Sequence, residues 1–509
     1  MHIDTTVLDP ILLTDEQMRQ FFVDGYLTFQ PTVPEGTHQV IDKKFSWLAE
    51  NETNPGNNIL PRLPELNLIL ESPEVRGAMI SLLGEDYLVH PHRYWHFLRP
   101  SDLNPNDQEA VWEKVKAQSH QDSYTPSGQP KSHYLRYARF MYYSHDVELA
   151  HGPTHVIPGS QYHAGLVDED HEREIPVMGR AGTVFLSHFD LGHAAGVNLS
   201  ERVRHMIKFI FMRASDPKLP TWQNDSSHWQ SPTNRLAPYD LEAVWQHQWA
   251  WQCGQQTVVN GTHAADDLNV STLTARLNTA TQAERSCAIY ALAALGEAAI
   301  APLIDQLIAA GEEERGNEIP SRCKKMTTTM EDAAYALASM GEVAIEPLIA
   351  LLDTPDEWTK LNAIFALGEI GPTAKEAVPA LLALLPDSSP LVLRYTATAL
   401  GNIGDPQAQT ALCHLLNSNL AGWDEISDFA LPASFLIHAN AAMALAKLGP
   451  KATASEAAII PHLNHPYGQV SYFLTETLRR IGTATALEAI IKDLNFRRWD
   501  ASLNAKRQF

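Results

Sequence analysis

The C-terminal half of the chain carries a repeat that restricts its fold more than any other feature of the sequence. Six segments of small and apolar residues, such as Ala291-Leu-Ala-Ala-Leu-Gly296, each end in a glycine; these glycines are Gly296, Gly341, Gly371, Gly404, Gly449 and Gly482. They are separated by 45, 30, 33, 45 and 33 residues. Such steps suit a two-helix unit with insertions near residues 311–328 and 418–434. Because stacked helix pairs share one core, we expect an all-α solenoid over residues 266–509.

The repeat resembles HEAT repeats, in particular the short kind found in phycobilin lyases. Each unit continues into a second apolar helix, as in Ala298–Ile304 and Val343–Ile349. The repeat has no cysteine placed for a chromophore and no acidic cluster that would carry lyase chemistry. We therefore expect a structural or recognition role, in which the concave face binds a protein partner, binds a second copy of the chain, or caps an active site.

The N-terminal half contains a set of residues suited to bind a metal. His120 and Asp122 are two apart, so on a strand both side chains point to the same face. His193, 73 residues further on, leaves enough chain for several strands between the two segments. Two imidazoles and one carboxylate with open positions suit non-haem Fe(II) that works on oxygen. The same motif recurs at His188-Phe189-Asp190, but no strands separate that copy from His193, which favours a loop.

A basic residue follows His193 at a distance of eleven residues. Arg204 precedes a mostly apolar run, 205–212, which suits the last strand of a barrel. An arginine that points inward from such a strand needs an acid to bind, and the far carboxylate of 2-oxoglutarate fits a guanidinium fork. Arg202 shares the strand register and is the alternative anchor, so Arg204 is preferred on spacing alone.

Together these motifs resemble the phytanoyl-CoA dioxygenase family of iron and 2-oxoglutarate enzymes. The resemblance covers roughly residues 10–215 and implies a jelly roll, or double-stranded β-helix, with flanking helices. We therefore predict a dioxygenase domain over residues 1–215, a connector packed on it over residues 216–265, and then the solenoid. Four further segments carry the resemblance: Leu13-Thr14-Asp15-Glu16-Gln17 through Asp24-Gly25-Tyr26-Leu27, Gly152 to Ser160, Ala181 to Leu186, and Gly196-x-Asn198-x-Ser200.

The resemblance also implies roles for individual residues. Iron(II) would be bound by His120, Asp122 and His193, and 2-oxoglutarate would chelate it with its far carboxylate on Arg204. Oxygen would take the remaining position, and the products would be a hydroxylated substrate, succinate and CO2. No catalytic residue is expected beyond the metal ligands. Where relatives often carry a small hydroxyl residue, two positions after the distal histidine, this chain has Ala195.

The strand expected at residues 90–99 is rich in aromatic and basic side chains. We predict that Trp95 faces inward and, with Gln121, contacts the cosubstrate. Arg93 and Tyr94 are the candidate substrate contacts. These side chains favour a polar or anionic small molecule, such as a metabolite or natural-product intermediate.

Other outcomes share the same ligands. The oxidant could desaturate, epimerise or cyclise its substrate, or hydroxylate a protein held by the repeats, since these outcomes depend on where the substrate C–H bond lies. A carboxylate ligand leaves no vacancy for halide, which disfavours halogenation. The alternative from another class is a HEAT-repeat scaffold with an inactive barrel, but that would require a lost ligand or anchor, and none is lost.

Composition excludes some partners. The formal net charge of -22 argues against nucleic acid or an anionic membrane as the main partner. The four cysteines are widely spaced and show no zinc pattern, which indicates unpaired thiols in a reducing compartment. The N-terminus lacks a signal-peptide pattern, and no stretch reaches the roughly 18 apolar residues of a membrane span. We therefore expect a soluble cytoplasmic protein.

Overall fold

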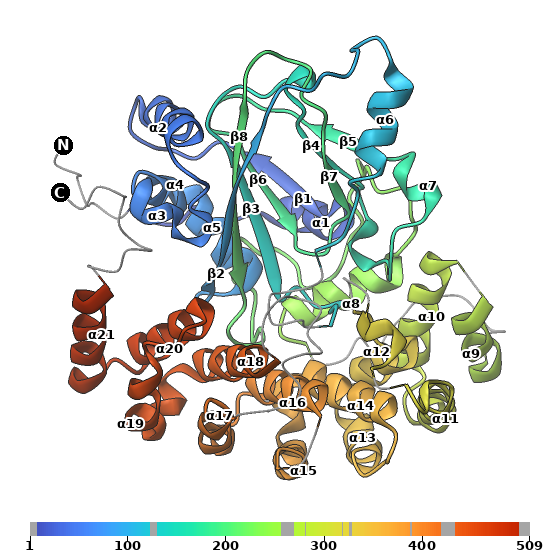
Figure 1. Ribbon diagram of the computed structural model, residues 1–509. Helices are drawn as coiled ribbons and strands as arrows, with labels where there is room; N and C mark the ends of the chain where they lie inside the picture. The colour runs from blue at the N-terminus through green and yellow to red at the C-terminus, as the bar shows by residue number, and fades with distance from the viewer. Residues whose placement is uncertain are drawn as a thin grey trace. The chain divides into compact units, whose positions relative to one another are not determined.

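The computed structural model divides the chain into two compact units (Figure 1). It describes residues 8–122, 130–255, 269–279, 281–317, 319–324, 328–386, 389–418 and 433–497. The first unit, here called the strand unit, comprises Met1–Asp122, Leu135–Arg213 and Leu219–Asp240. The second, here called the helical unit, comprises Ser123–Tyr134, Ala214–Lys218 and Leu241–Phe509. The chain thus passes between the units more than once, and two of the crossings lie on either side of Ala214–Lys218.

Helices of the strand unit precede and interrupt its strands. The sequence pattern predicts helices over about residues 14–24, 37–50 and 73–84, and these are confirmed as the first, second and fifth of the series. The sequence also predicts a capping box at Thr14 and Gln17 and a glycine stop at Gly25. Both are present, and Gly25 ends the first helix with φ 82, a conformation that favours glycine. The helices are α1 (Asp15–Asp24), α2 (Thr37–Asn51), α3 (Ile59–Arg62), α4 (Leu66–Leu70), α5 (Pro73–Leu83), α6 (Gln108–Lys116) and α7 (Asp168–His171).

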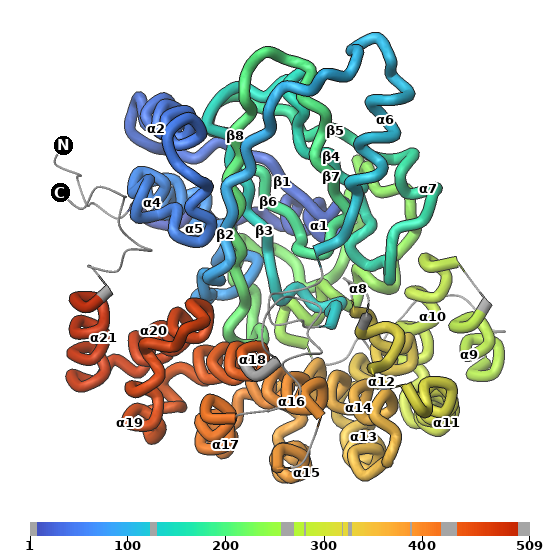
Figure 2. Tube along the Cα trace, viewed as in Figure 1, coloured from blue at the N-terminus to red at the C-terminus, as the bar shows by residue number. Residues whose placement is uncertain are grey.

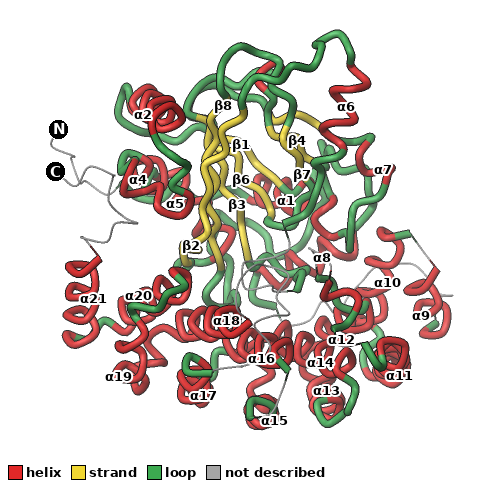
Figure 3. The backbone as a smooth tube through the Cα atoms, viewed as in Figure 1, coloured by secondary structure: helices red, strands yellow, loops and turns green. Residues whose placement is uncertain are grey.

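Two antiparallel sheets form the centre of the strand unit (Figure 3). The larger has the strand order β1-β6-β3-β8-β2 and the smaller the order β5-β4-β7. Met141, Phe185 and Met206 of the larger sheet share one hydrophobic cluster with Val156 and Val177 of the smaller, so the core lies between the sheets. The strands are β1 (Tyr26–Phe29), β2 (Leu88–Leu98), β3 (Tyr137–Tyr143), β4 (Thr154–Val156), β5 (Ile175–Val177), β6 (Val184–His188), β7 (His193–Ala195) and β8 (Arg204–Met212).

Strand β8 lies between β3 and β2 and is buried along its whole length. Side chains alternate between the faces of a strand, so Arg204, Met206 and Lys208 share one face. Met206 belongs to the cluster between the sheets, which assigns that face to the inside. His205 lies on the other face, beside Phe45 of α2. The helix α2 therefore covers the outside of β8.

The segment Leu219–Asp240 packs on α1 through buried carboxylates. Trp222 Nε1 donates to Asp15 Oδ1 at 2.6 Å. Asp24 accepts the backbone N–H groups of Leu236 and Ala237 at 2.9 and 2.8 Å. A buried carboxylate without such donors would be costly, so this segment is part of the folded strand unit.

The helical unit is a row of antiparallel helix pairs (Figure 2). Its inner helices α10, α12, α14, α16, α18 and α20 each pack on the next. All six repeat glycines have positive φ, and each follows a helix, as the sequence indicated. The insertion predicted at 418–434 lies almost wholly outside the described residues. The helices are α8 (Glu242–Gln252), α9 (Val270–Thr279), α10 (Gln282–Ala294), α11 (Glu297–Glu314), α12 (Asp332–Met340), α13 (Ile345–Leu351), α14 (Glu357–Ile370), α15 (Val378–Ala383), α16 (Pro390–Ile403), α17 (Gln409–Leu415), α18 (Ala433–Leu448), α19 (Glu456–Ile459), α20 (Gly468–Ile481) and α21 (Ala484–Arg497).

One segment of this unit meets the length and hydropathy of a membrane span, contrary to the expectation from the sequence. Asp332–Leu351 has 20 residues and a window of mean hydropathy 1.4, of which 61% is buried. The segment consists of α12 and α13 joined by a turn at Gly341–Ala344. Burial between neighbouring helices accounts for its apolar composition.

Close contact between inner helices depends on glycine. A Cβ atom added at Gly401 of α16 would lie 2.8 Å from Ala444 Cα of α18. We expect Gly401→Ala to lower the free energy of unfolding by about 1 to 3 kcal/mol, because the backbone of α18 must shift. Gly468→Ala is the matched control, since nothing lies within 4 Å of that position. Chemical unfolding of both variants checks this, and equal stability would contradict the packing described here.

Candidate metal and 2-oxoglutarate site

The structure brings His120, Asp122 and His193 together. One ligand atom from each lies within 4.8 Å of the others. The backbone of His120 pairs with that of His193 in both directions, N to O, at 2.9 and 3.0 Å. This two-way pairing sets the chain segment after α6 beside β7 and aligns the two histidines. Among the described residues, no other group of three such side chains is this compact.

Both histidines are oriented by backbone carbonyls. His120 Nδ1 lies 2.7 Å from Gln118 O, and His193 Nδ1 lies 3.0 Å from Leu191 O. An Nδ1–H that donates to a carbonyl leaves the Nε2 lone pair for a metal. The two Nε2 atoms face Asp122, at 3.5 Å from Oδ1 for His120 and 3.8 Å from Oδ2 for His193. The three donors therefore converge, as a metal site of this kind requires.

Two basic side chains contact the carboxylate of Asp122. Arg139 Nη2 of β3 lies 3.1 Å from Oδ2, and Lys208 Nζ of β8 lies 3.3 Å from the same oxygen. Burial alone would raise the pKa of Asp122, but Arg139, Lys208 and the two histidines together lower that pKa well below its ordinary value. Arg139 Nη1 also lies 3.1 Å from His193 Nδ1, but a guanidinium can only donate, so it makes no hydrogen bond to an Nδ1–H that donates to Leu191 O. Arg139 thus pairs with Asp122 and lies beside His193.

Arg204 lies on the inner face of β8 with 1% of its surface exposed. Its Nε and Nη1 atoms are buried and have no hydrogen-bond partner. Burial lowers the pKa of Arg204, and Tyr143 opposes that shift. A buried guanidinium with two orphaned donors fits an anion, and a carboxylate can accept both N–H groups. By contrast, Arg202 is half exposed and pairs with Asp42, so it does not fit the role of anchor.

Gln121 does not face the other candidates. Its side-chain nitrogen donates to Ser160 O at 2.9 Å and to Asp190 O at 3.1 Å. As the middle residue between His120 and Asp122, it points to the opposite side of an extended segment. The geometry therefore does not support the predicted contact between Gln121 and the cosubstrate, because its amide nitrogen ties two loops together.

The geometry does not support the predicted contact between Trp95 and the cosubstrate either. Trp95 is fully buried, but it stacks on Phe45 of α2, with ring centroids 5.1 Å apart, and packs beside His205. This is the outer face of the sheet. Arg93 shares that face by alternation along β2, so it does not point to the metal ligands either.

Tyr94 lies on the other face of β2. It pairs with Lys208 of β8 in the register of the two strands, and its ring lies 4.8 Å from that of His96. Tyr94 is 41% exposed, so this face reaches solvent. Of the two substrate residues predicted from the sequence, Tyr94 is the one that shares a face of the sheet with Lys208, which contacts Asp122.

The outer position of Trp95 predicts how a substitution behaves. We expect Trp95→Phe to lower the free energy of unfolding by about 1 to 2 kcal/mol through lost packing. The dissociation constant for 2-oxoglutarate should stay within about threefold of the wild-type value, since the ring faces α2. Thermal unfolding measures the stability, and a 2-oxoglutarate titration measures the dissociation constant. A tenfold higher dissociation constant in Trp95→Phe would show that Trp95 contacts the cosubstrate.

Sequence reasoning missed four side chains of the inner face. They are Arg139, Lys208 and two histidines of β2, His92 and His96. Burial, followed by the positive charge of Lys208, lowers the pKa of His92 to about 4 and that of His96 to about 3. Lys208 could have been identified from its position in the sequence. It follows Arg204 by four residues in an apolar run, and strand alternation places both side chains on the same face.

His145, His151, His155, His163 and His171 share no strand or helix register in the sequence, which predicts loop or surface positions, but several of them are internal. His145 and His163 are buried, and His163 lies 3.4 Å from Asp170. His155 and His171 flank the buried carboxylate of Glu174, at 4.0 and 3.3 Å. Neither pair forms a compact three-residue group within the described part of the chain.

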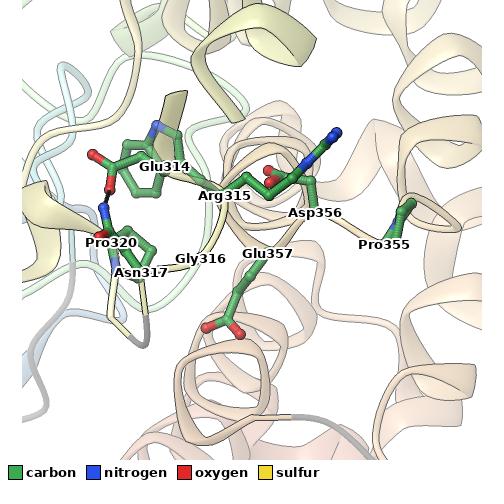
Figure 4. A pocket seen from close by; sticks show the side chains of 9 residues that line it. Glu314, Arg315, Gly316, Asn317, Pro320, Pro355, Asp356 and Glu357 are labelled. Atoms are coloured by element: carbon green, nitrogen blue, oxygen red, sulfur yellow. Dashed lines mark hydrogen bonds between the residues drawn. The ribbon is translucent and has the colours of Figure 1, made fainter. Parts of the chain in front are cut away.

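The helical unit has a cleft of its own, with a volume of about 290 Å³, between α11 and α14 (Figure 4). Its acidic side chains serve local structure. Glu314 accepts from Asn317 and Ser321, Asp356 caps α14 at Thr359, and Glu357 accepts from Ser389. The cleft therefore has no set of donors free to bind a cofactor comparable to the one in the strand unit.

Comparison with known proteins agrees with these observations. The sequence profile of the phytanoyl-CoA dioxygenase (PhyH) family matches residues 38–206. The profile for HEAT repeats matches residues 345–423, and that for the PBS lyase HEAT-like repeat matches residues 331–354. No curated protein matches the chain.

Solved structures similar to this chain cover less than half of it. The carbocyclase SnoK of nogalamycin biosynthesis, described as non-haem and α-ketoglutarate dependent, is 19% identical over 41% of this chain and 88% of its own, with a TM-score of 0.31. HygX from Streptomyces hygroscopicus, solved with nickel and 2-oxoglutarate, is 16% identical over 40% and 87%, with a TM-score of 0.30. EctD from S. alaskensis, solved with iron, is 17% identical over 41% and 82%, with a TM-score of 0.32. Likenesses this weak carry none of the assignment.

The predicted resemblance is thus confirmed for both parts of the chain. Residues 38–206 are a phytanoyl-CoA dioxygenase domain, and HEAT repeats follow within residues 331–423. The protein is a non-haem iron oxygenase that depends on 2-oxoglutarate.

Proposed function

We propose that this oxygenase hydroxylates an unactivated C–H bond of a small-molecule metabolite or natural-product intermediate, with succinate and CO2 as coproducts. The observation that supports it best is the convergence of three buried or half-buried donors, His120, Asp122 and His193, in the same unit as Arg204, a buried arginine with orphaned N–H groups. A scaffold with an inactive barrel would have no reason to retain this arrangement.

In this proposal each residue has a defined part. His120, Asp122 and His193 hold Fe(II), and Arg204 binds the far carboxylate of 2-oxoglutarate. Bound there, iron and 2-oxoglutarate supply an oxidant that removes hydrogen from a C–H bond. Arg139 orients the carboxylate of Asp122, and the carbonyl of Leu191 orients the ring of His193. These interactions position the ligands before the substrate arrives.

Helix α6 is proposed to support the strand that carries His193. Its residues Val111, Trp112 and Val115 pack against Ala194 and Val197, which follow His193 in the chain. Since Ala194 alternates with His193 along β7, this apolar cover lies on the face of β7 opposite to the His193 ring. The two sheets with this cover are proposed to form the double-stranded β-helix expected from the sequence. The HEAT repeats are proposed to bind a protein partner or a second copy.

The test is an assay of the purified protein with Fe(II), 2-oxoglutarate and oxygen. We expect slow formation of succinate without substrate, and faster formation when a fraction of small-molecule metabolites contains the substrate. Mass spectrometry then identifies the reaction, because hydroxylation adds one oxygen, desaturation or oxidative cyclisation removes two hydrogens, and epimerisation leaves the mass unchanged. No succinate under any condition, with iron bound, would contradict the proposal.

A further inference from the structure

The inner face of the strand unit carries more positive charge than its acidic residue balances. Arg139, Lys208 and Arg204 are all buried, at 0%, 8% and 1% exposed. The charges of Asp122 and Arg139 act on the pKa of Lys208, and Tyr143 acts on the pKa of Arg204. Within the described residues, Asp122 is the carboxylate that pairs with Arg139 and Lys208, and Arg204 makes no ion pair with a carboxylate. Residues 123–129, which follow Asp122, contain no acidic residue in the sequence.

The proposed cofactors do not remove this excess. Iron(II) adds two positive charges and takes Asp122 as a ligand, while 2-oxoglutarate adds two negative charges and occupies Arg204. Arg139 keeps its contacts to Asp122 and to Phe189 O. Lys208 is then left beside a carboxylate whose charge is shared with the metal and Arg139. A buried ammonium with so weak a counter-charge is costly unless a further anion joins it.

The position of Lys208 indicates where that anion comes from. In the sheet it is paired with Tyr94 of β2, whose ring is exposed to solvent. His96 lies on the same face and is kept neutral, so it can donate or accept a hydrogen bond without adding charge. The side chain of His120 is 38% exposed, so the ligand side of this face also reaches solvent. A molecule that enters here meets Tyr94 and His96 on the face where Lys208 Nζ lies 3.3 Å from Asp122 Oδ2.

We propose that the substrate carries an anionic group, a carboxylate, phosphate or sulfate, and that Lys208 binds it with Tyr94 and His96 at its side. This inference rests on the proposed function, because it takes the metal and 2-oxoglutarate to occupy the remaining charges. It gives Lys208 the specificity role that the sequence had suggested for Arg93. The alternative is that Lys208 binds 2-oxoglutarate itself, through the carboxylate that chelates iron.

The experiment uses the full chain with Fe(II) and 2-oxoglutarate under anaerobic conditions. Acetate, inorganic phosphate and sulfate are added separately at constant ionic strength, and acetamide serves as the uncharged probe. The metal-to-ligand charge-transfer band and the midpoint of thermal unfolding report binding. We expect at least one anion to perturb both readouts with saturation, while acetamide does not.

Two variants assign the effect. Lys208→Met should weaken anion binding at least tenfold and leave the dissociation constant for 2-oxoglutarate within threefold, whereas Lys208→Arg should retain anion binding. Equal anion binding by Lys208→Met, or no anion effect on a wild-type protein that shows the band, would overturn the inference alone. A tenfold loss of 2-oxoglutarate affinity in Lys208→Met would assign the lysine to the cosubstrate and also overturn it. A wild-type protein without the band would remove the proposed function and this inference together.

Discussion

Asp122→Asn is expected to raise the dissociation constant for Fe(II) by more than about 100-fold and to abolish turnover of 2-oxoglutarate. The substitution keeps the volume of the side chain but removes the anionic ligand. It also leaves Arg139 and Lys208, which contact the same oxygen, without their shared counter-charge. Repulsion between these cations and the metal therefore adds to the lost bond. An anaerobic Fe(II) titration with a metal assay measures the affinity.

Asp102→Asn is the matched control, because Asp102 is an exposed carboxylate of the same unit. It should bind iron as the wild type does. Circular dichroism of both variants separates loss of metal from loss of fold. Near-normal iron affinity in folded Asp122→Asn would show that the carboxylate is not a ligand.

Arg204→Met is expected to weaken 2-oxoglutarate binding by at least about 30-fold, because a charge-assisted bidentate contact contributes roughly 2 kcal/mol or more. Iron affinity should change little, since no metal donor is altered. The methionine fills similar space and removes the orphaned buried donors, so the fold should be retained or stabilised. A 2-oxoglutarate titration of the iron-loaded protein gives the value.

Arg202→Met serves as the control for this second variant. Its guanidinium lies two residues away, is half exposed and pairs with Asp42. Its effect on 2-oxoglutarate affinity should be below about twofold. If Arg202→Met weakened the binding and Arg204→Met did not, the anchor would have been assigned to the wrong arginine.

Local rules predicted the elements that depend on neighbours in sequence. The capping box at Thr14 and Gln17, the glycine stop at Gly25 and the repeat glycines all belong to this kind, because a few adjacent residues determine each. The grouping of His120 with Asp122 follows from strand alternation. The position of His193 beside His120 and Asp122 could be expected mainly through the family resemblance, since His193 lies 73 residues after His120.

Which face of β2 points to the inside of the sheets could not be predicted from the sequence. The alternation of side chains along a strand shows which residues share a face, but it does not show which face is buried against the other sheet. Trp95 was expected to face inward, but α2 covers the outer face and supplies Phe45 as its partner. Arg139 was overlooked because its partners, Asp122 and His193, are distant in sequence. The assignment of Ser123–Tyr134 to the helical unit likewise depends on tertiary contacts, such as Tyr335 to Lys131 O at 2.8 Å.

The most direct test of the central claim is the anaerobic addition of 2-oxoglutarate to the Fe(II)-loaded protein. The account predicts a weak visible metal-to-ligand charge-transfer band in the wild type, which is absent in Asp122→Asn and requires much more 2-oxoglutarate in Arg204→Met. A wild-type protein that binds iron and shows no such band at saturating 2-oxoglutarate would contradict the account.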